Sequence, residues 1–146
     1  MRNRVEVMNG VNLDQLGRRD PGHYGDLTHP ELERQLGDWG RELGLQTRVF
    51  QTNHEGEYVE HLHWLEGMAD AVILNPGSWT HYAWSIHDAL EIAALPAVEV
   101  HISDIQNRDE WRRHSVIAPL CLETISGRGP EGYRLALERL ARELGE

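Results

Sequence analysis

The sequence predicts an α/β fold in which helices cover both faces of a mostly parallel sheet. Short runs rich in β-branched residues alternate along the chain with longer segments whose apolar residues recur at helical spacing. One such run, residues 71–74, is continuously apolar, which is typical of a strand buried on both faces. The 146 residues suit a single domain, residues 1–146, with five strands separated by helices.

The strands are expected where short apolar runs end in polar or turn-forming residues. Residues 5–8 read Val-Glu-Val-Met, and residues 47–51 carry Val and Phe between polar neighbours. Residues 71–74 are ended by Asn-Pro-Gly, a turn signal. The last two strands are expected at residues 97–102 and 119–125.

Capping signals and hydrophobic periodicity predict the helices. Thr28 and Glu31 have the spacing of a capping box, Pro30 falls in the first turn, and Gly44 is placed to end the helix. The remaining helices are expected at residues 57–67, 80–94 and 133–144.

Composition excludes several kinds of chemistry. All 14 basic residues are arginine, and without lysine a Schiff-base mechanism is impossible. The single cysteine, Cys121, excludes an internal disulfide and any multi-cysteine metal site. The net charge of −10 argues against non-specific nucleic-acid binding. Because no apolar run approaches the roughly 18 residues of a membrane span and no signal peptide is evident, we expect a cytoplasmic protein with no membrane partner.

Residues 9–25 form an unusually long connection after the first strand, since a structural connection needs only about 2–6 residues. The segment contains four glycines, the adjacent arginines Arg18 and Arg19, and Tyr24. A nearby cation can stabilise a phenolate, which makes a tyrosine usable as a base. The loop is therefore predicted to be functional.

Other polar residues gather where the expected strands end. Residues 53–55 follow the second strand, Asn75 the third, and residues 103–114 the fourth. Ligands of open parallel sheets bind beyond the carboxyl ends of the strands. The pattern thus predicts a site at this edge of the sheet.

Glu99 and His101 lie two residues apart on the expected fourth strand and so share one of its faces. A carboxylate beside a histidine orients the ring and favours its protonated form, which suits a general acid. The alternative is a structural histidine that is hydrogen-bonded at a strand end.

Arg108 and Arg112 are four residues apart, so in a helical turn both would reach the same side. Together they could bind an oxyanion or polar hydroxyls. The alternative is a solvated turn in which Asp109 and Glu110 pair with them.

Asn75 and His81 flank the turn after the third strand and are expected to face the cleft. Ser78 or Thr80 could cap the following helix, whose first amide groups favour an anion. The alternative is that these residues serve only the turn and the cap. Asp88 follows His81 by seven residues, which would place it two turns along the same helical face.

A catalytic metal is not expected. His61 and His63 are two apart on a predicted helix and point in different directions, and the spacing that a zinc site needs is missing. Trp79 and Trp84, which flank His81, are candidates for a subunit contact.

Four blocks of the sequence, in order and spacing, resemble the type II 3-dehydroquinate dehydratases over nearly the full length: Asn9-Gly10-x-Asn12-Leu13 through Gly17-x-Arg19-Asp20-Pro21-x-x-Tyr24-Gly25; Gln51-Thr52-Asn53-His54-Glu55-Gly56; Ile73-Leu74-Asn75-Pro76-Gly77-x-x-Thr80-His81; and Glu99-Val100-His101-Ile102-Ser103 through Arg108-Asp109-Glu110-x-Arg112-x-His114-Ser115. The resemblance implies a flavodoxin-like three-layer sandwich with strand order 2-1-3-4-5. It also implies reversible dehydration of 3-dehydroquinate to 3-dehydroshikimate through an enolate, with no metal and no cofactor.

The resemblance implies a role for each matching residue. Tyr24 would be the base that removes the proton next to the substrate ketone, and Arg19 would stabilise its phenolate. Asn12 would meet the developing enolate charge through water. His101, oriented by Glu99, would protonate the departing hydroxyl.

Substrate-binding roles are implied in the same way. Asn75, Ser103 and the backbone amide of Ile102 would hold the substrate carboxylate or neighbouring hydroxyls. His81 and Arg112 would bind the remaining hydroxyls.

Asp88 matches a family residue that reaches the site of a neighbouring subunit, so the resemblance implies a homo-oligomer, with trimers assembled into a dodecamer. The chain departs from the family pattern at Val11, His87, Asp104 and residues 82–84, which bear on assembly and affinity rather than on the reaction. Two alternatives are a non-catalytic binding domain of this family and a flavin or nucleotide module, although no Gly-x-Gly-x-x-Gly follows the first strand.

Overall fold

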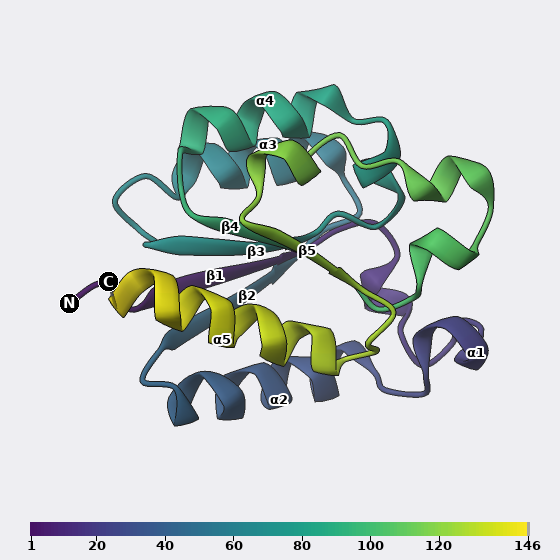
Figure 1. Ribbon diagram of the computed structural model, residues 1–146, viewed down its shortest axis with the longest axis horizontal. Coiled ribbons are helices and arrows are strands. Elements are labelled where there is room, and N and C mark those ends of the chain that lie inside the picture. The colour runs from purple at the N-terminus through teal and green to yellow at the C-terminus, as the bar shows by residue number, and fades with distance from the viewer. Residues whose placement is uncertain (146) are drawn as a thin grey trace.

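A parallel sheet runs through the centre of the molecule, in a computed structural model that describes residues 1–145 (Figure 1). Within these residues the sheet has five strands in the order β2-β1-β3-β4-β5, which confirms the predicted flavodoxin-like order. The last residue of the predicted domain, residue 146, lies outside the described part. The strands are β1 (Arg4–Asn9), β2 (Gln46–Gln51), β3 (Ala71–Asn75), β4 (Ala97–His101) and β5 (Glu123–Ser126).

Helices cover both faces of the sheet, as predicted. Helices α2 and α5 lie on one face and α3 and α4 on the other, while the short α1 lies beyond the strand ends (Figure 1). Their bounds are α1 (Pro21–Tyr24), α2 (His29–Glu42), α3 (Glu55–Trp64), α4 (Trp84–Ala93) and α5 (Glu131–Gly145).

The core has one layer on each face because neighbouring residues of a strand point to opposite sides. On β1, Val7 packs into the layer with α2 and α5, whereas Met8 packs into the layer with α3 and α4. Leu32 and Leu36 of α2 are fully buried in the first layer. Each such leucine contributes roughly 1.5–3 kcal/mol of hydrophobic stabilisation.

The start of α2 is the capping box that the sequence predicts. The Thr28 hydroxyl accepts from the Glu31 amide at 3.3 Å, and the Glu31 carboxylate accepts from the Thr28 amide at 3.1 Å. The helix ends at Glu42, and Gly44 follows with a φ of +74°. This backbone conformation favours glycine, which explains why the helix stops there.

Two predicted elements are present, but their predicted bounds were wrong. The helix expected over residues 80–94 is broken: residues Gly77–His81 form a 3₁₀ turn, and α4 begins only at Trp84. The Thr80 side chain does not cap a helix, because its hydroxyl donates to Glu99 at 2.6 Å. The strand expected over residues 119–125 begins late, since Ala118–Leu120 is a 3₁₀ turn.

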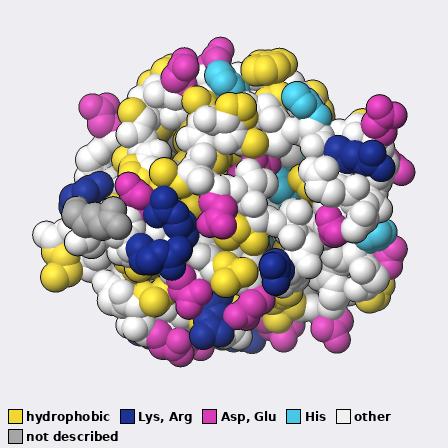
Figure 2. All heavy atoms as spheres, in the orientation of Figure 1, with side chains coloured by type: hydrophobic (Ala, Val, Ile, Leu, Met, Phe, Trp, Pro, Cys, Tyr) yellow, Lys and Arg dark blue, Asp and Glu magenta, His cyan; other side chains and the backbone are white. Residues whose placement is uncertain are grey.

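Side chains of opposite charge are interspersed over the face seen in Figure 2. None of the helices in residues 1–145 has the length and hydropathy needed to cross a bilayer.

Candidate active site

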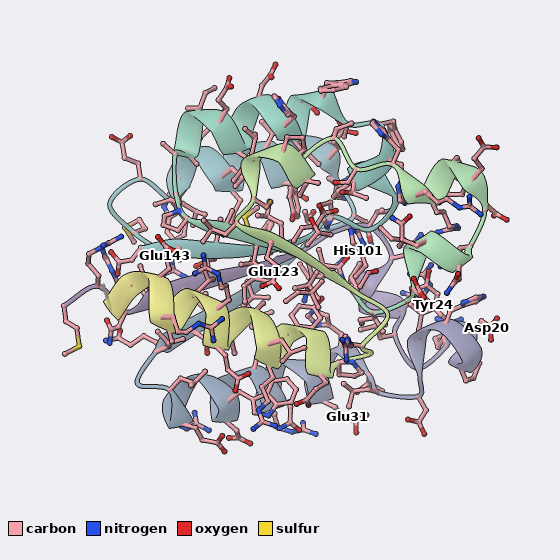
Figure 3. All side chains as sticks on the ribbon, in the orientation of Figure 1. Asp20, Tyr24, Glu31, His101, Glu123 and Glu143 are labelled. Carbon is pink, nitrogen blue, oxygen red and sulfur yellow. The ribbon has the colours of Figure 1, made fainter. Side chains whose placement is uncertain are left out.

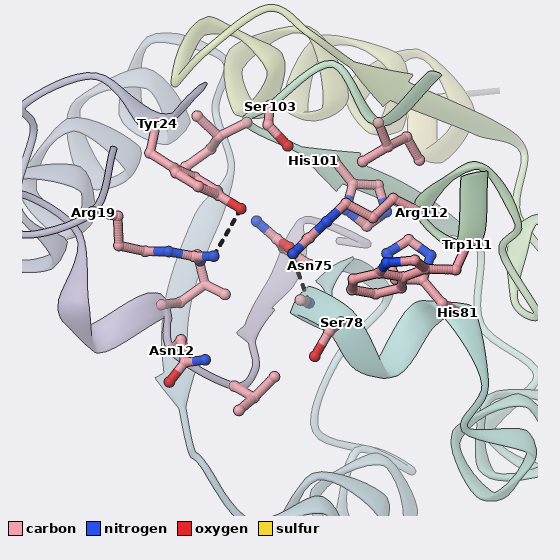
Figure 4. A pocket seen from close by; sticks show the side chains of 15 residues that line it. Asn12, Arg19, Tyr24, Asn75, Ser78, His81, His101, Ser103, Trp111 and Arg112 are labelled. Carbon is pink, nitrogen blue, oxygen red and sulfur yellow. Dashed lines mark hydrogen bonds between the residues drawn. The ribbon is translucent and has the colours of Figure 1, made fainter. Parts of the chain in front are cut away.

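Most of the predicted site residues line one pocket at the carboxyl ends of the strands (Figure 4). Figure 3 shows Tyr24 and His101 at this end of the sheet, with Glu143 at the opposite end. The predicted residues in the pocket wall are Asn12, Arg19, Tyr24, Asn75, His81, His101, Ile102, Ser103 and Arg112. Apolar side chains, among them Val11, Leu13, Ile105 and Trp111, complete the wall.

Tyr24 is held by the short helix α1. The Asp20 side chain caps this helix by accepting from the Gly22 amide at 2.9 Å, and Pro21 occupies its first turn. Gly25, with a φ of +69°, ends the helix immediately after Tyr24. Tyr24 is buried and lines the pocket, with its phenolic oxygen directed into it (Figure 4).

Two guanidinium groups converge on the phenolic oxygen of Tyr24. Arg19 Nη2 donates to it at 2.7 Å, and Arg108 Nη1 donates at 2.5 Å. The Arg19 guanidinium carbon also lies 3.7 Å from the centroid of the tyrosine ring. Two cations at one oxygen stabilise negative charge on it, which is the condition for a tyrosinate base.

Burial lowers the pKa of Arg19. The Tyr24 oxygen opposes this effect, while the positive charges of Arg108 and Arg112 reinforce it. Three arginines therefore share one partly buried region, and this concentration of positive charge favours an anionic ligand.

Arg108 is missing from the predicted site, although the sequence singles it out beside Arg112. The two arginines do not share one helical turn, the condition under which both would reach the same side, because Arg108 follows the 3₁₀ turn Ile105–Asn107 and Arg112 belongs to the next one, Glu110–Arg113. Arg108 also donates to Ser103 Oγ at 3.2 Å. It thus connects the tyrosine to the end of β4.

Glu99 and His101 share a face of β4, as predicted, and both are buried. His101 Nε2 lies 2.5 Å from Glu99 Oε2. Burial would raise the pKa of the Glu99 carboxyl, but hydrogen bonds from His101, Thr80 and Ser115 outweigh it, and the pKa is lowered. Glu99 is therefore an anion that fixes the imidazole and leaves its other nitrogen, Nδ1, for the pocket.

His81 lies beside His101, with ring centroids 6.3 Å apart. Its Nδ1 donates to the His114 carbonyl at 2.7 Å. Burial lowers the pKa of His81 despite this hydrogen bond, and the nearby His101 and Arg112 charges lower it further. A neutral ring with its proton on Nδ1 presents Nε2 as an acceptor, which suits a ligand hydroxyl.

Arg112 brings an unsatisfied donor to the pocket. Within residues 1–145, its Nε is buried and has no hydrogen-bond partner. The Asp109 carboxylate lies 3.8 Å away, beyond hydrogen-bond distance. A buried donor without a partner costs free energy, and an anionic or hydroxyl-bearing ligand would remove that cost.

Asp88 is not brought to the pocket formed by residues 1–145. It lies on α4 with its side chain 71% exposed and pairs with His87 at 2.9 Å. The prediction that it continues the helical face of His81 was wrong, because the chain breaks between the 3₁₀ turn and α4.

In the described part of the chain, no cluster of three or more metal-ligating side chains occurs. His61 binds the buried Glu6 carboxylate at 2.6 Å and stacks on Phe50.

The model of the family described as Dehydroquinase class II matches residues 3–141. The chain belongs to this family. Proteins named 3-dehydroquinate dehydratase are similar to it in sequence. The protein from Thermotoga maritima is 49% identical over 143 residues, with 98% of each chain covered. The protein from Thermus thermophilus is 48% identical, with 96% of this chain and 95% of that one covered.

Solved class II dehydroquinases have the same fold. The type II dehydroquinase from Propionibacterium acnes superposes with a TM-score of 0.92 at 43% identity, covering 97% of this chain and 98% of that one. The enzyme from Butyrivibrio crossotus gives a TM-score of 0.92 at 33% identity, covering 95% and 97%. Family membership and fold therefore agree with the resemblance read from the sequence.

Proposed function

We propose that this chain catalyses the reversible dehydration of 3-dehydroquinate to 3-dehydroshikimate with Tyr24 as base and His101 as acid. The proposal is carried by one observation: Tyr24, with two guanidinium groups on its oxygen, and His101, which is held by the Glu99 carboxylate, both line the same pocket (Figure 4). The first arrangement favours proton removal, and the second favours proton donation.

The reaction would proceed in two proton transfers. The Tyr24 phenolate takes the proton next to the substrate ketone, and the electrons of the C–H bond pass to the carbonyl oxygen as an enolate. Asn12, reached through water, stabilises this charge. The enolate then expels the neighbouring hydroxyl, which leaves as water after it accepts a proton from His101.

The substrate carboxylate and hydroxyls would be bound by the polar residues that line the pocket. Arg112 and Ser103 supply donors, and the neutral His81 supplies an acceptor. Asn75 and the Ile102 amide complete the set. This arrangement uses no metal, cofactor or lysine.

The test is an assay of purified protein for the rise in ultraviolet absorbance of the conjugated enone product. We expect turnover in the presence of a chelator and after borohydride treatment, because no imine can form without lysine. His101→Asn should abolish most of it, whereas His63→Asn, at an exposed position, should not. No turnover by the wild type at high enzyme concentration would refute the proposal in favour of a binding domain.

We further propose that the cytoplasmic enzyme is a homo-oligomer built from trimers, assembled into a dodecamer, with Asp88 completing the site of a neighbouring subunit. Tyr82, Trp84 and Ile92, on or next to α4, are each more than half exposed, as expected for a contact surface. Light scattering should give a multiple of three subunits, and Asp88→Asn should raise KM more than Asp38→Asn on α2. A fully active monomer would contradict this assembly.

A further inference from the structure

A line of buried polar groups leads from the pocket into the core beneath α5. Asn75, at the end of β3, donates from Nδ2 to the Tyr133 hydroxyl at 2.8 Å. Tyr133 lies on α5 and donates in turn to Asn9 Oδ1 at 2.7 Å. The Asn9 amide nitrogen lies 3.1 Å from His29 Nε2, at the start of α2.

The direction of these hydrogen bonds is determined at the pocket end of the line, at Asn75. Gly77 N–H donates to Asn75 Oδ1 at 3.2 Å, so the Asn75 oxygen faces the turn and its nitrogen faces Tyr133. The Tyr133 oxygen accepts that proton and directs its own toward Asn9. Asn9 Nδ2 then donates to His29 Nε2. Each of these three hydrogen bonds is therefore donated by the group nearer the pocket to the group farther from it.

The two asparagines are neighbours across the sheet, since Asn9 of β1 pairs in register with Asn75 of β3. Tyr133 bridges both from the α5 side and is completely buried. Burial raises the pKa of Tyr133, against the opposing effect of the Asn75 hydrogen bond, and keeps the phenol protonated. A neutral hydroxyl can accept from one asparagine and donate to the other at the same time.

We propose that Tyr133 is a positioning residue that orients Asn75 for substrate binding. One proton of Asn75 Nδ2 is committed to Tyr133, and the Asn75 oxygen is committed to Gly77. The second Nδ2 proton is left for the pocket, so Asn75 presents a donor to a carboxylate or hydroxyl oxygen of the ligand. The inference rests on the proposed function, because it assigns Asn75 a part in binding that substrate.

The test compares two buried tyrosines. Tyr133→Phe removes the hydroxyl that holds Asn75. Tyr58→Phe is the matched control, because Tyr58 is equally buried and its hydroxyl donates to the Met8 carbonyl, at 2.8 Å. We expect KM to rise about tenfold in Tyr133→Phe, in the range for a lost hydrogen bond to a charged group, with a smaller change in kcat. KM should stay at the wild-type value in Tyr58→Phe.

A double-mutant cycle separates positioning from general stability. If Tyr133 acts through Asn75, Tyr133→Phe should raise KM in the wild-type background and have no further effect in an Asn75→Ala background. An equal rise in both backgrounds, or no rise in either, would overturn the proposal. Should Tyr133→Phe fail to fold, His29→Ala tests the line of hydrogen bonds from its more exposed end. This variant should likewise raise KM in the wild-type background and have no further effect in the Asn75→Ala background.

The outcome also separates this inference from the proposed function. Turnover by the wild type with an unchanged KM in Tyr133→Phe refutes the positioning role alone. No turnover by the wild type refutes the proposed reaction. In that case denaturant unfolding decides: additive effects of Tyr133→Phe and Asn75→Ala would overturn the coupling, and non-additive effects would support it.

Discussion

Arg108 Nη1 lies 2.5 Å from the phenolic oxygen of Tyr24, although the two residues are 84 positions apart in the chain. The second guanidinium on that oxygen, Arg19, comes from only five residues away. The surroundings of the Tyr24 oxygen are therefore assembled from the opening loop and the segment after β4. Any movement of the opening loop that separates Tyr24 from Arg108 would remove one of its two cations.

Tyr24→Phe should lower kcat by about 10²–10⁴-fold, the usual contribution of a general base. Phenylalanine keeps the ring and its packing, so thermal stability should change little. Steady-state assays and thermal unfolding check both parts. Tyr58→Phe, at a tyrosine outside the pocket wall whose hydroxyl donates to the Met8 carbonyl, is the control and should keep the wild-type kcat. Equal rates for the Tyr24 variant and the parent would reject Tyr24 as the base.

Arg108→Met should lower kcat by about 10²–10³-fold, as expected when one preorganised electrostatic contact is removed. Steady-state kinetics of the variant and the wild type check this. Arg113→Ala, at an exposed arginine nearby, should keep the wild-type kcat. An unchanged kcat in Arg108→Met would show that the contact of Arg108 with Tyr24 does not serve the reaction.

Arg112→Leu should raise KM by about 10–100-fold, because a hydrogen bond to a charged group is worth roughly 1.5–3 kcal/mol. The substitution also removes the buried Nε that lacks a partner within residues 1–145, so the free enzyme should not lose stability. Kinetics and thermal unfolding of the same preparation separate the two effects. A lowered kcat with an unchanged KM would argue against a binding role.

Glu99 should make stability depend on acid pH. Its pKa is lowered in the folded state because the hydrogen bonds from His101, Thr80 and Ser115 outweigh burial. A carboxyl with a lowered pKa stabilises the fold above its unfolded pKa of about 4.3, and this contribution is lost as pH falls through the folded value. The thermal midpoint of the wild type should therefore drop on acidification below that range.

Glu99→Gln should flatten this drop, since an amide does not titrate, and should also lower kcat by at least about tenfold because His101 loses its anionic partner. Glu123→Gln, on the exposed edge of β5, is the matched control and should keep the wild-type pH dependence. If the glutamine variant at position 99 lost stability with acid as steeply as wild type, other carboxyls would be responsible.

The parts of the fold that could be predicted have local signals. The capping box at Thr28 and Glu31 and the apolar run of β3 each lie within a few residues of sequence. The broken helix before α4 could not be predicted in this way. Thr80 looks like a helix cap locally, but its hydroxyl binds the Glu99 carboxylate, 19 residues away.

The sequence by itself determined the α/β class, the alternation of strands and helices, and the exclusion of lysine chemistry, because these depend on periodicity, capping and composition. Only the tertiary structure decided which polar side chains meet: Arg108 with Tyr24, and Tyr133 with Asn75 across 58 positions. The physical reason is the distance along the sequence over which each kind of interaction acts. Backbone preferences act between near neighbours, whereas contacts between side chains depend on strand order, register and the helix that packs above them.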